Sequence, residues 1–117
     1  MFRGFRQTLS ALGLALVVAC NSPTLPLPPP ALPTVSVSPD PAKVHLSSDR
    51  GAEPNAIVVI INTNPNIPRD KNVGGATADQ NGSWFTDVYG ADGDVVEISQ
   101  EFGTTMSAPV RLILHPK

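Results

Sequence analysis

The shortness of its apolar runs is the feature that most limits how this chain can fold. Beyond residue 33, apolar and polar side chains alternate over a few residues, and proline, glycine or asparagine then ends each run. A spacing of two places successive side chains on opposite faces of a strand, whereas an amphipathic helix needs apolar residues three or four apart over several turns. The pattern predicts short β-strands, and the 13 prolines and 9 glycines of the chain supply the breaks between them.

About seven segments carry this strand pattern, at intervals of about ten residues. They are 35–37, 44–46, 57–61, 73–77, 83–89, 96–98 and 110–114. The segment 57–61 is β-branched throughout, and we predict that it is a central strand buried on both faces. Asn81-Gly82 predicts a hairpin turn, since both residue types tolerate a positive φ. Seven short strands in 34–117 predict an all-β fold, a small antiparallel sandwich.

Four stretches in the second half of this domain carry a family resemblance. Val73–Asp79 reads VGGATAD, and NGSW, GDVVEI and SAPV follow at 81–84, 93–98 and 107–110. This order of turn glycines and apolar strands is similar to that of the bacterial Ig-like domains of surface and secreted proteins. The resemblance covers about half of the domain and implies an Ig-like sandwich. A transthyretin-like sandwich is the nearest alternative.

The N-terminus has the layout of an export signal. Arg3 and Arg6 precede an apolar run, 9–19, that ends at Cys20, the only cysteine of the chain. This run is too short to cross a bilayer as a helix, which takes about 20 residues. We therefore predict that residues 1–19 are a signal peptide that is removed.

The junction Val17–Cys20, with the sequence VVAC, resembles the lipobox of bacterial lipoproteins, although valine replaces the commoner leucine at its first position. The resemblance implies a diacylglycerol (and palmitate) on the Cys20 thiol, and hence a membrane as partner. Asn21 in place of aspartate implies the outer membrane, by analogy with enterobacterial sorting. The alternative is an ordinary signal peptide with a cysteine that becomes buried.

A proline-rich segment joins the predicted anchor to the predicted domain. Six of the thirteen residues in 21–33 are proline, which favours an extended polyproline II spacer within a linker, 20–33. A PxxP ligand for a partner's groove is the alternative interpretation.

Without Arg3 and Arg6 the chain keeps six basic and ten acidic side chains, a net charge of −4. The basic residues are scattered, so nucleic acid is not an expected partner.

Aromatic residues of the segment 83–89 suggest a binding surface. Alternation predicts Trp84 in the core, and Phe85 and Tyr89 together on the opposite face. Exposed rings on one sheet face could form a platform for a glycan or a protein partner. Packing in the core is the alternative for these two rings.

Acidic turns suggest a second kind of site, a structural calcium ion. Its candidate ligands are Asp79, Asn81, Asp92 and Asp94. Their spacing does not fit an EF-hand loop, and aspartate and asparagine are also ordinary turn residues. The two histidines, His45 and His115, have no zinc-binding spacing, so no zinc site is expected, and the covalent lipid is the expected added group with structural calcium as the alternative.

No nucleophile elbow, SxxK pair or phosphate-binding loop occurs in the sequence. We therefore expect a protein of the cell envelope that is not an enzyme and that acts as a structural or interaction module. The alternatives are a lipoprotein that binds a saccharide or a cation and an accessory subunit of an envelope complex.

Overall fold

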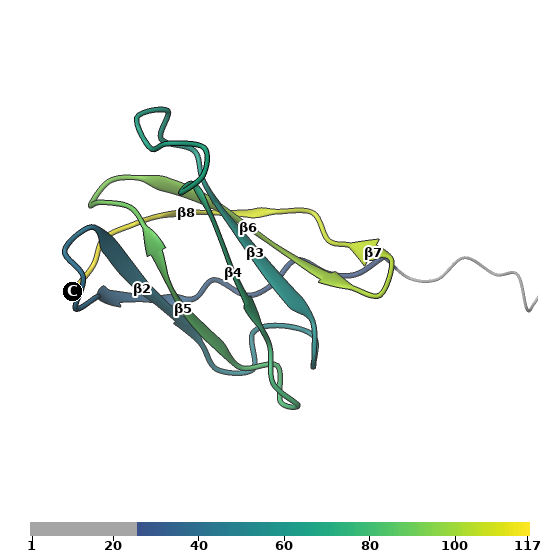
Figure 1. Cartoon of the computed structure of the whole chain (residues 1–117). Coiled ribbons are helices and arrows are strands. Elements are labelled where there is room, and N and C mark those ends of the chain that lie inside the picture. The colour runs from purple at the N-terminus through teal and green to yellow at the C-terminus, as the bar shows by residue number, and fades with distance from the viewer. Residues whose placement is uncertain (1–25) are drawn as a thin grey trace, which may run out of the picture.

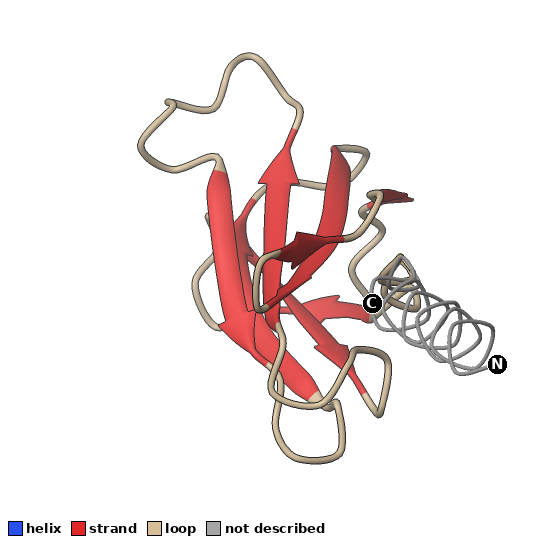
Figure 2. Ribbon diagram, turned by 90° about the vertical axis from the view of Figure 1, so that its right-hand side faces the viewer, coloured by secondary structure: helices blue, strands red, loops and turns tan. Residues whose placement is uncertain are grey.

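Antiparallel strands make up all the regular structure in the computed structural model, which describes residues 26–117 (Figures 1 and 2). The predicted signal peptide and Cys20 lie outside the described residues. The strands are β1 (Thr34–Val37), β2 (Lys43–Ser48), β3 (Ile57–Asn62), β4 (Val73–Thr77), β5 (Trp84–Tyr89), β6 (Val95–Phe102), β7 (Thr105–Met106) and β8 (Val110–Ile113). Within residues 26–117 there is no helix long and apolar enough to cross a membrane.

The strands form two sheets that face each other (Figure 2). One sheet has the order β1-β2-β5, and the other has the order β4-β3-β6, with β7 and β8 both paired to β6. Every pair is antiparallel. The predicted all-β sandwich is thus confirmed. In an immunoglobulin constant domain the fourth strand lies beside the fifth, whereas here β4 lies beside β3 in the opposite sheet.

The sequence predicted a hairpin turn at Asn81-Gly82, but this turn does not join two paired strands of one sheet. It carries the chain from β4 in one sheet to β5 in the other. Only Gly82 has a positive φ, of 81°, and a Cβ atom at this position would collide with the Ala52 carbonyl oxygen. The Asp79 Oδ1 atom holds the turn by accepting hydrogen bonds from the N–H groups of Asn81 and Ser83.

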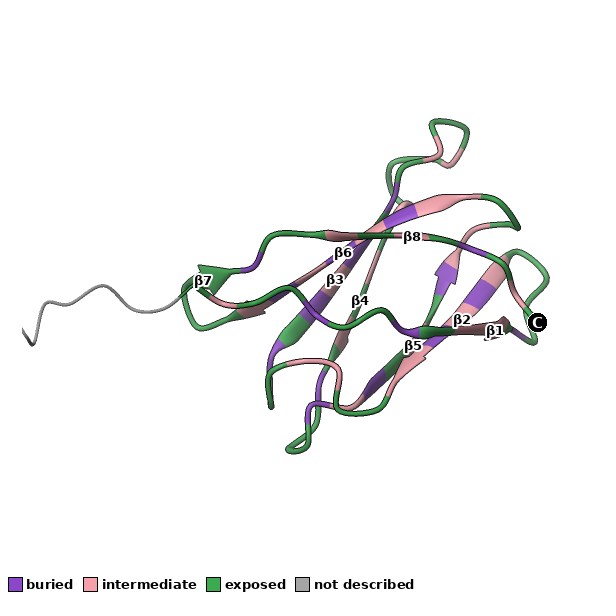
Figure 3. Cartoon of the chain, turned by 180° about the vertical axis from the view of Figure 1, so that it is seen from behind, coloured by how far each residue is buried: buried purple, intermediate pink, exposed green. Residues whose placement is uncertain are grey.

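The core lies between the sheets and draws alternate residues from each (Figure 3). The three-stranded sheet contributes Val44, Leu46, Trp84 and Val88, and the other sheet contributes Val58, Ile60, Val96 and Ile98. Trp84 is 3% exposed, which confirms the prediction that it lies inside. Burial of such apolar side chains is the main stabilising contribution in a domain of this kind.

The β-branched sequence of strand β3 predicted burial on both faces, but only one face is buried. Val58 and Ile60 point into the core, whereas Ile57 and Ile61 are 50% and 39% exposed on the outer face. The reason is that β3 lies in the interior of its sheet, between β4 and β6, but only its inner face is covered by the second sheet. Val73, opposite Ile61, extends this exposed apolar surface onto β4, and Ile113 is a further exposed apolar residue on β8.

Residues 28–33 of the predicted spacer are attached to the sandwich. The Gln100 side chain, 2% exposed, donates a hydrogen bond of 2.6 Å to the Pro28 carbonyl and accepts one of 2.7 Å from the Glu53 N–H group. The Ala31 N–H group donates to the Gly51 carbonyl at 2.8 Å, and two further prolines, at 30 and 33, are buried. Only residues 21–27 therefore separate Cys20 from the first of these contacts.

Candidate functional site

Polar and aromatic side chains share the outer face of β2 and β5. Strand register places Lys43 opposite Tyr89, His45 opposite Asp87 and Ser47 opposite Phe85. Residues two apart on a strand share a face, so these three pairs form one continuous surface, which we call the β2–β5 face. The inner partners of the same strands fill the core, and this fixes which residues point outward.

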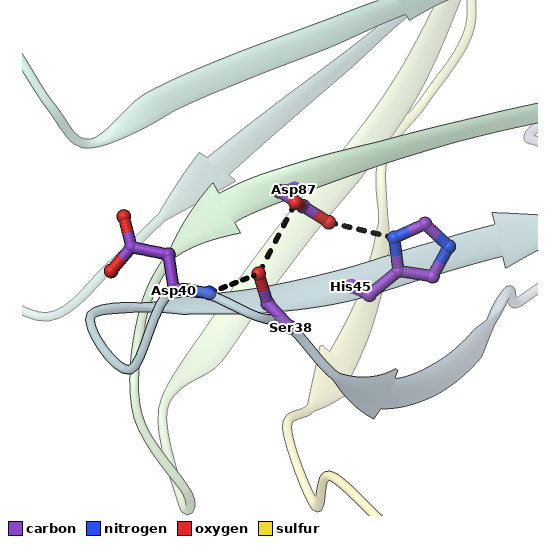
Figure 4. A network of polar contacts seen from close by, with 4 residues as sticks. All are labelled: Ser38, Asp40, His45 and Asp87. Carbon is purple, nitrogen blue, oxygen red and sulfur yellow. Dashed lines mark hydrogen bonds and ion pairs between the residues drawn. The ribbon is translucent and has the colours of Figure 1, made fainter.

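A hydrogen-bonded network lies at the centre of the β2–β5 face (Figure 4). The His45 Nδ1 atom is 2.6 Å from Asp87 Oδ1, and the Ser38 hydroxyl donates to Asp87 Oδ2 at 3.1 Å. The Asp40 N–H group in turn donates to the Ser38 hydroxyl oxygen at 3.2 Å. The hydrogen bond with His45 is the main reason why the pKa of Asp87 is lowered, and partial desolvation opposes it.

The order of groups in this network differs from that of a nucleophilic triad. In a triad the histidine lies between the hydroxyl and the carboxylate, so that it can take the hydroxyl proton. Here Asp87 lies between Ser38 and His45 (Figure 4). The Ser38 hydroxyl therefore donates directly to the Asp87 carboxylate, and His45 is not placed to take its proton.

One end of the β2–β5 face is positively charged. The Lys43 Nζ atom lies 4.7 Å from the centre of the Tyr89 ring, and Lys71 Nζ lies 5.3 Å from it. Both distances suit cation–π attraction. Lys71 comes from the loop between β3 and β4, so a segment of the five-stranded sheet reaches across to the three-stranded sheet here.

The predicted platform residues share the β2–β5 face, but they are not adjacent. Phe85 is 74% exposed, whereas Tyr89 is half-buried beside the two lysines. The Asp87–His45 pair lies between them, with the His45 ring 6.2 Å from that of Phe85. The surface is therefore a row of an aromatic ring, a polar pair and a second aromatic ring, and Phe85 supplies its freely accessible ring.

Asp94 organises the long loop beside Tyr89. Its carboxylate accepts hydrogen bonds from the side-chain amides of Asn62 and Asn64 and from the Ala91 N–H group, at 2.9–3.0 Å. Burial alone would raise the pKa of Asp94, but the three hydrogen bonds outweigh burial and lower it. Next to this network lies an open cleft of about 360 Å³, lined by Tyr89, Lys71 and the loop.

The four candidate calcium ligands fall into two separate turns. Asp79 and Asn81 lie in the turn before β5, and Asp92 and Asp94 lie in the turn after it, at the opposite end of that strand. Asp92 is 2.9 Å from His115 Nδ1, and Asp94 is engaged as described above. Within residues 26–117, no three histidine, cysteine or acidic side chains are grouped closely enough to bind a metal ion.

The sequence did not single out Ser38, Lys43, His45, Asp87 or Lys71 as members of one surface. The alternation in β2 and β5 carried part of the signal, because it places Lys43 and His45 on one face of their strand. The pairing of β2 with β5, which are not consecutive in the chain, was needed to bring that face beside Phe85 and Tyr89.

Comparisons of the chain with family models, with curated proteins and with solved structures gave no significant match.

Proposed function

We propose that this chain is a lipoprotein of the bacterial cell envelope and not an enzyme, and that its Ig-like sandwich contacts another envelope component.

 The observation that carries the proposal is the sequence VVAC, in which the only cysteine of the chain directly follows an apolar run and a small residue. Two or three acyl chains on Cys20 would hold the protein firmly at a membrane. Asn21 at the next position favours the outer membrane.

The β2–β5 face supports an interaction role for the domain. Phe85 exposes 74% of its surface, and the neighbouring His45–Asp87–Ser38 network holds polar groups in fixed positions around it. An exposed aromatic ring with ordered polar neighbours is typical of protein and glycan contacts. We propose a protein partner, because the clefts beside Tyr89 and Trp84 are open and do not enclose a small ligand.

The anchor is tested by metabolic labelling of the full chain with radioactive palmitate. Label should enter the wild-type chain and be absent from Cys20→Ser, which should also leave the membrane fraction. Equal labelling of both chains, or a mature protein that retains Met1, would refute the anchor.

The contact face is tested by cross-linking in intact cells that express the full chain. Phe85→Ser should remove a partner that cross-links to the wild-type chain, whereas Phe102→Ser, which changes an exposed phenylalanine on another strand, should retain it. Loss with both variants, or with neither, would contradict a role for the β2–β5 face. Binding of glycan fragments that depends on Phe85 would favour the saccharide-binding alternative.

A further inference from the structure

Strand β4 forms an edge of the five-stranded sheet that lacks the usual protection against pairing. Its sequence, VGGAT, contains no charge and no proline, and β3 is its only neighbour in the sheet. Natural sheets blunt their edges with charged residues, prolines or breaks in the strand. Among the other edges of the described sandwich, β1 lies between Pro33 and Pro39, β5 carries Asp87 in its middle, and Pro109 separates β7 from β8.

The hydrogen bonds at the two ends of the β3–β4 ladder show which β4 groups are free. The Asn62 N–H group donates to Asn72, and the Ala78 N–H group donates to Ala56, both at 2.8 Å. Directly opposite residues in an antiparallel pair alternate between bonded and non-bonded. The even-numbered residues of β4 therefore face β3, and Val73, Gly75 and Thr77 direct their N–H and C=O groups to the open edge, where all three are exposed.

These free groups are arranged symmetrically about Gly75. In an antiparallel pair of two copies centred on this residue, Gly75 lies opposite Gly75, and Val73 lies opposite Thr77 of the second copy. All three free N–H groups and all three free C=O groups of each copy then find partners, as a two-fold axis requires. A register displaced by one residue would instead place free groups opposite groups that already bond to β3.

The charges that flank β4 match the same register. Lys71 lies four residues before Gly75 and Asp79 lies four residues after it. The two-fold pairing therefore brings Lys71 of each copy toward Asp79 of the other. Lys71 is exposed and already lies on this side of the sandwich, beside Tyr89 of β5. Asp79 Oδ1 is occupied by the turn, and Oδ2 accepts no hydrogen bond from the described residues.

From these observations we infer that β4 is a self-association edge, through which two copies of this chain pair antiparallel about Gly75 into one continuous sheet. The pairing also joins the exposed apolar surfaces around Ile61 and Val73 of the two copies. Two short strands bury less area than the 1,200–2,000 Å² or so of a stable interface. The dimer should therefore be weak in solution and be favoured where the chain is concentrated.

Sedimentation equilibrium of the full chain in non-ionic detergent, up to about 1 mM, tests the pairing. We expect a monomer–dimer equilibrium. Lys71→Glu should weaken association about tenfold, because it places a carboxylate opposite Asp79. Lys43→Glu is the matched control, since Lys43 also contacts the Tyr89 ring but lies on β2, and it should leave association unchanged. Thr77→Pro removes a free N–H group and should abolish dimers while circular dichroism shows an intact sheet.

Cysteine cross-linking supplies a second measurement that does not depend on these variants. Paired residues of this kind have Cα atoms about 5.5 Å apart, within disulfide range. Gly75→Cys should give disulfide-linked dimers above the wild-type background, to which Cys20 contributes only where its thiol carries no lipid, and Thr34→Cys on the β1 edge should not. A monomer at all concentrations, equal cross-linking at both positions, or a dimer unaffected by Lys71→Glu and Thr77→Pro would overturn the inference. None of these results depends on acylation of Cys20, so the anchor can fail independently.

Discussion

The two sheets supply the core in the same way but differ on their outer faces. The three-stranded sheet turns Lys43, His45 and Asp87 outward, whereas the five-stranded sheet turns Ile57 and Ile61 outward. The inner faces must be apolar because they bury each other, whereas no further layer of the described chain covers either outer face, although the β3–β4 loop reaches one of them at Tyr89. The difference shows that alternation fixes which residues enter the core, while the outer residues remain free to serve other contacts.

The largest difference in the free energy of unfolding should separate substitutions of two adjacent isoleucines, Ile60 and Ile61, which lie on opposite faces of β3. Ile60→Ala should lower the free energy of unfolding by about 2–5 kcal/mol, because it opens a cavity in the core. Ile61→Ala should cost less than about 1 kcal/mol, since its side chain is partly in water. Urea unfolding measures both. Equal losses would mean that the outer face of the five-stranded sheet is covered after all.

The second-largest effect on the free energy of unfolding should come from Gln100, a buried polar residue of the five-stranded sheet. Gln100→Ala should cost about 1–3 kcal/mol, because it leaves the Pro28 carbonyl and the Glu53 N–H group without their partner. Ser99→Ala, at the neighbouring position on the outer face, is the control and should change stability little. Faster amide exchange at Glu53 in Gln100→Ala would identify the lost bond, and unchanged exchange there would contradict this assignment.

The carboxylate of Asp94, in the turn between β5 and β6, should make the free energy of unfolding depend on pH. Because the pKa of Asp94 is lowered in the folded state, its contribution is complete above the ordinary value of 3.8 and is lost as the pH falls through the folded value. Asp94→Asn should cost about 1–2 kcal/mol at neutral pH, since an amide N–H₂ group replaces an acceptor oxygen. The difference from the wild-type chain should shrink in acid, and a difference that grows below pH 3.8 would contradict the direction of the shift.

The smallest expected effect is on the pKa of Asp87, in the exposed hydrogen-bonded network of the three-stranded sheet. His45→Ala should raise the pKa of Asp87 toward its ordinary value, because it removes the hydrogen bond that contributes most to the lowering. Ser38→Ala should raise this pKa less, and Lys43→Ala least. Carboxyl-carbon NMR titration measures the three shifts. A larger shift in Lys43→Ala than in His45→Ala would show that charge, rather than hydrogen bonding, controls Asp87.

Local alternation was sufficient to predict most strands and the inward position of Trp84. It could not show that β3 is covered on one face, because β-branched residues favour any strand, whichever faces are buried. The crossing between sheets at Gly82 depends on which strands pair, and this is decided by contacts between distant segments. Strand β7 was missed because two residues, Thr105 and Met106, are too few to show a period.

The candidate site was predicted only in part, for a related reason. Phe85 and Tyr89 were placed on one face by their spacing within a single strand. The sequence gives no sign that Asp87 pairs with His45, 42 residues away, or that Lys71 reaches Tyr89 from a loop. The attachment of Pro28 was also missed, because polyproline segments usually lack internal hydrogen bonds and are expected to remain solvated.

The attachment of Pro28 to Gln100 also decides where a mechanical load would enter the sandwich. Tension along the N-terminal segment would reach the Pro28–Gln100 hydrogen bond first, and then the bond between Ala31 and Gly51. Only after both had broken would it peel β1 from β2. Force would thus be shared between the layers, and the terminal strand would be shielded from being unzipped.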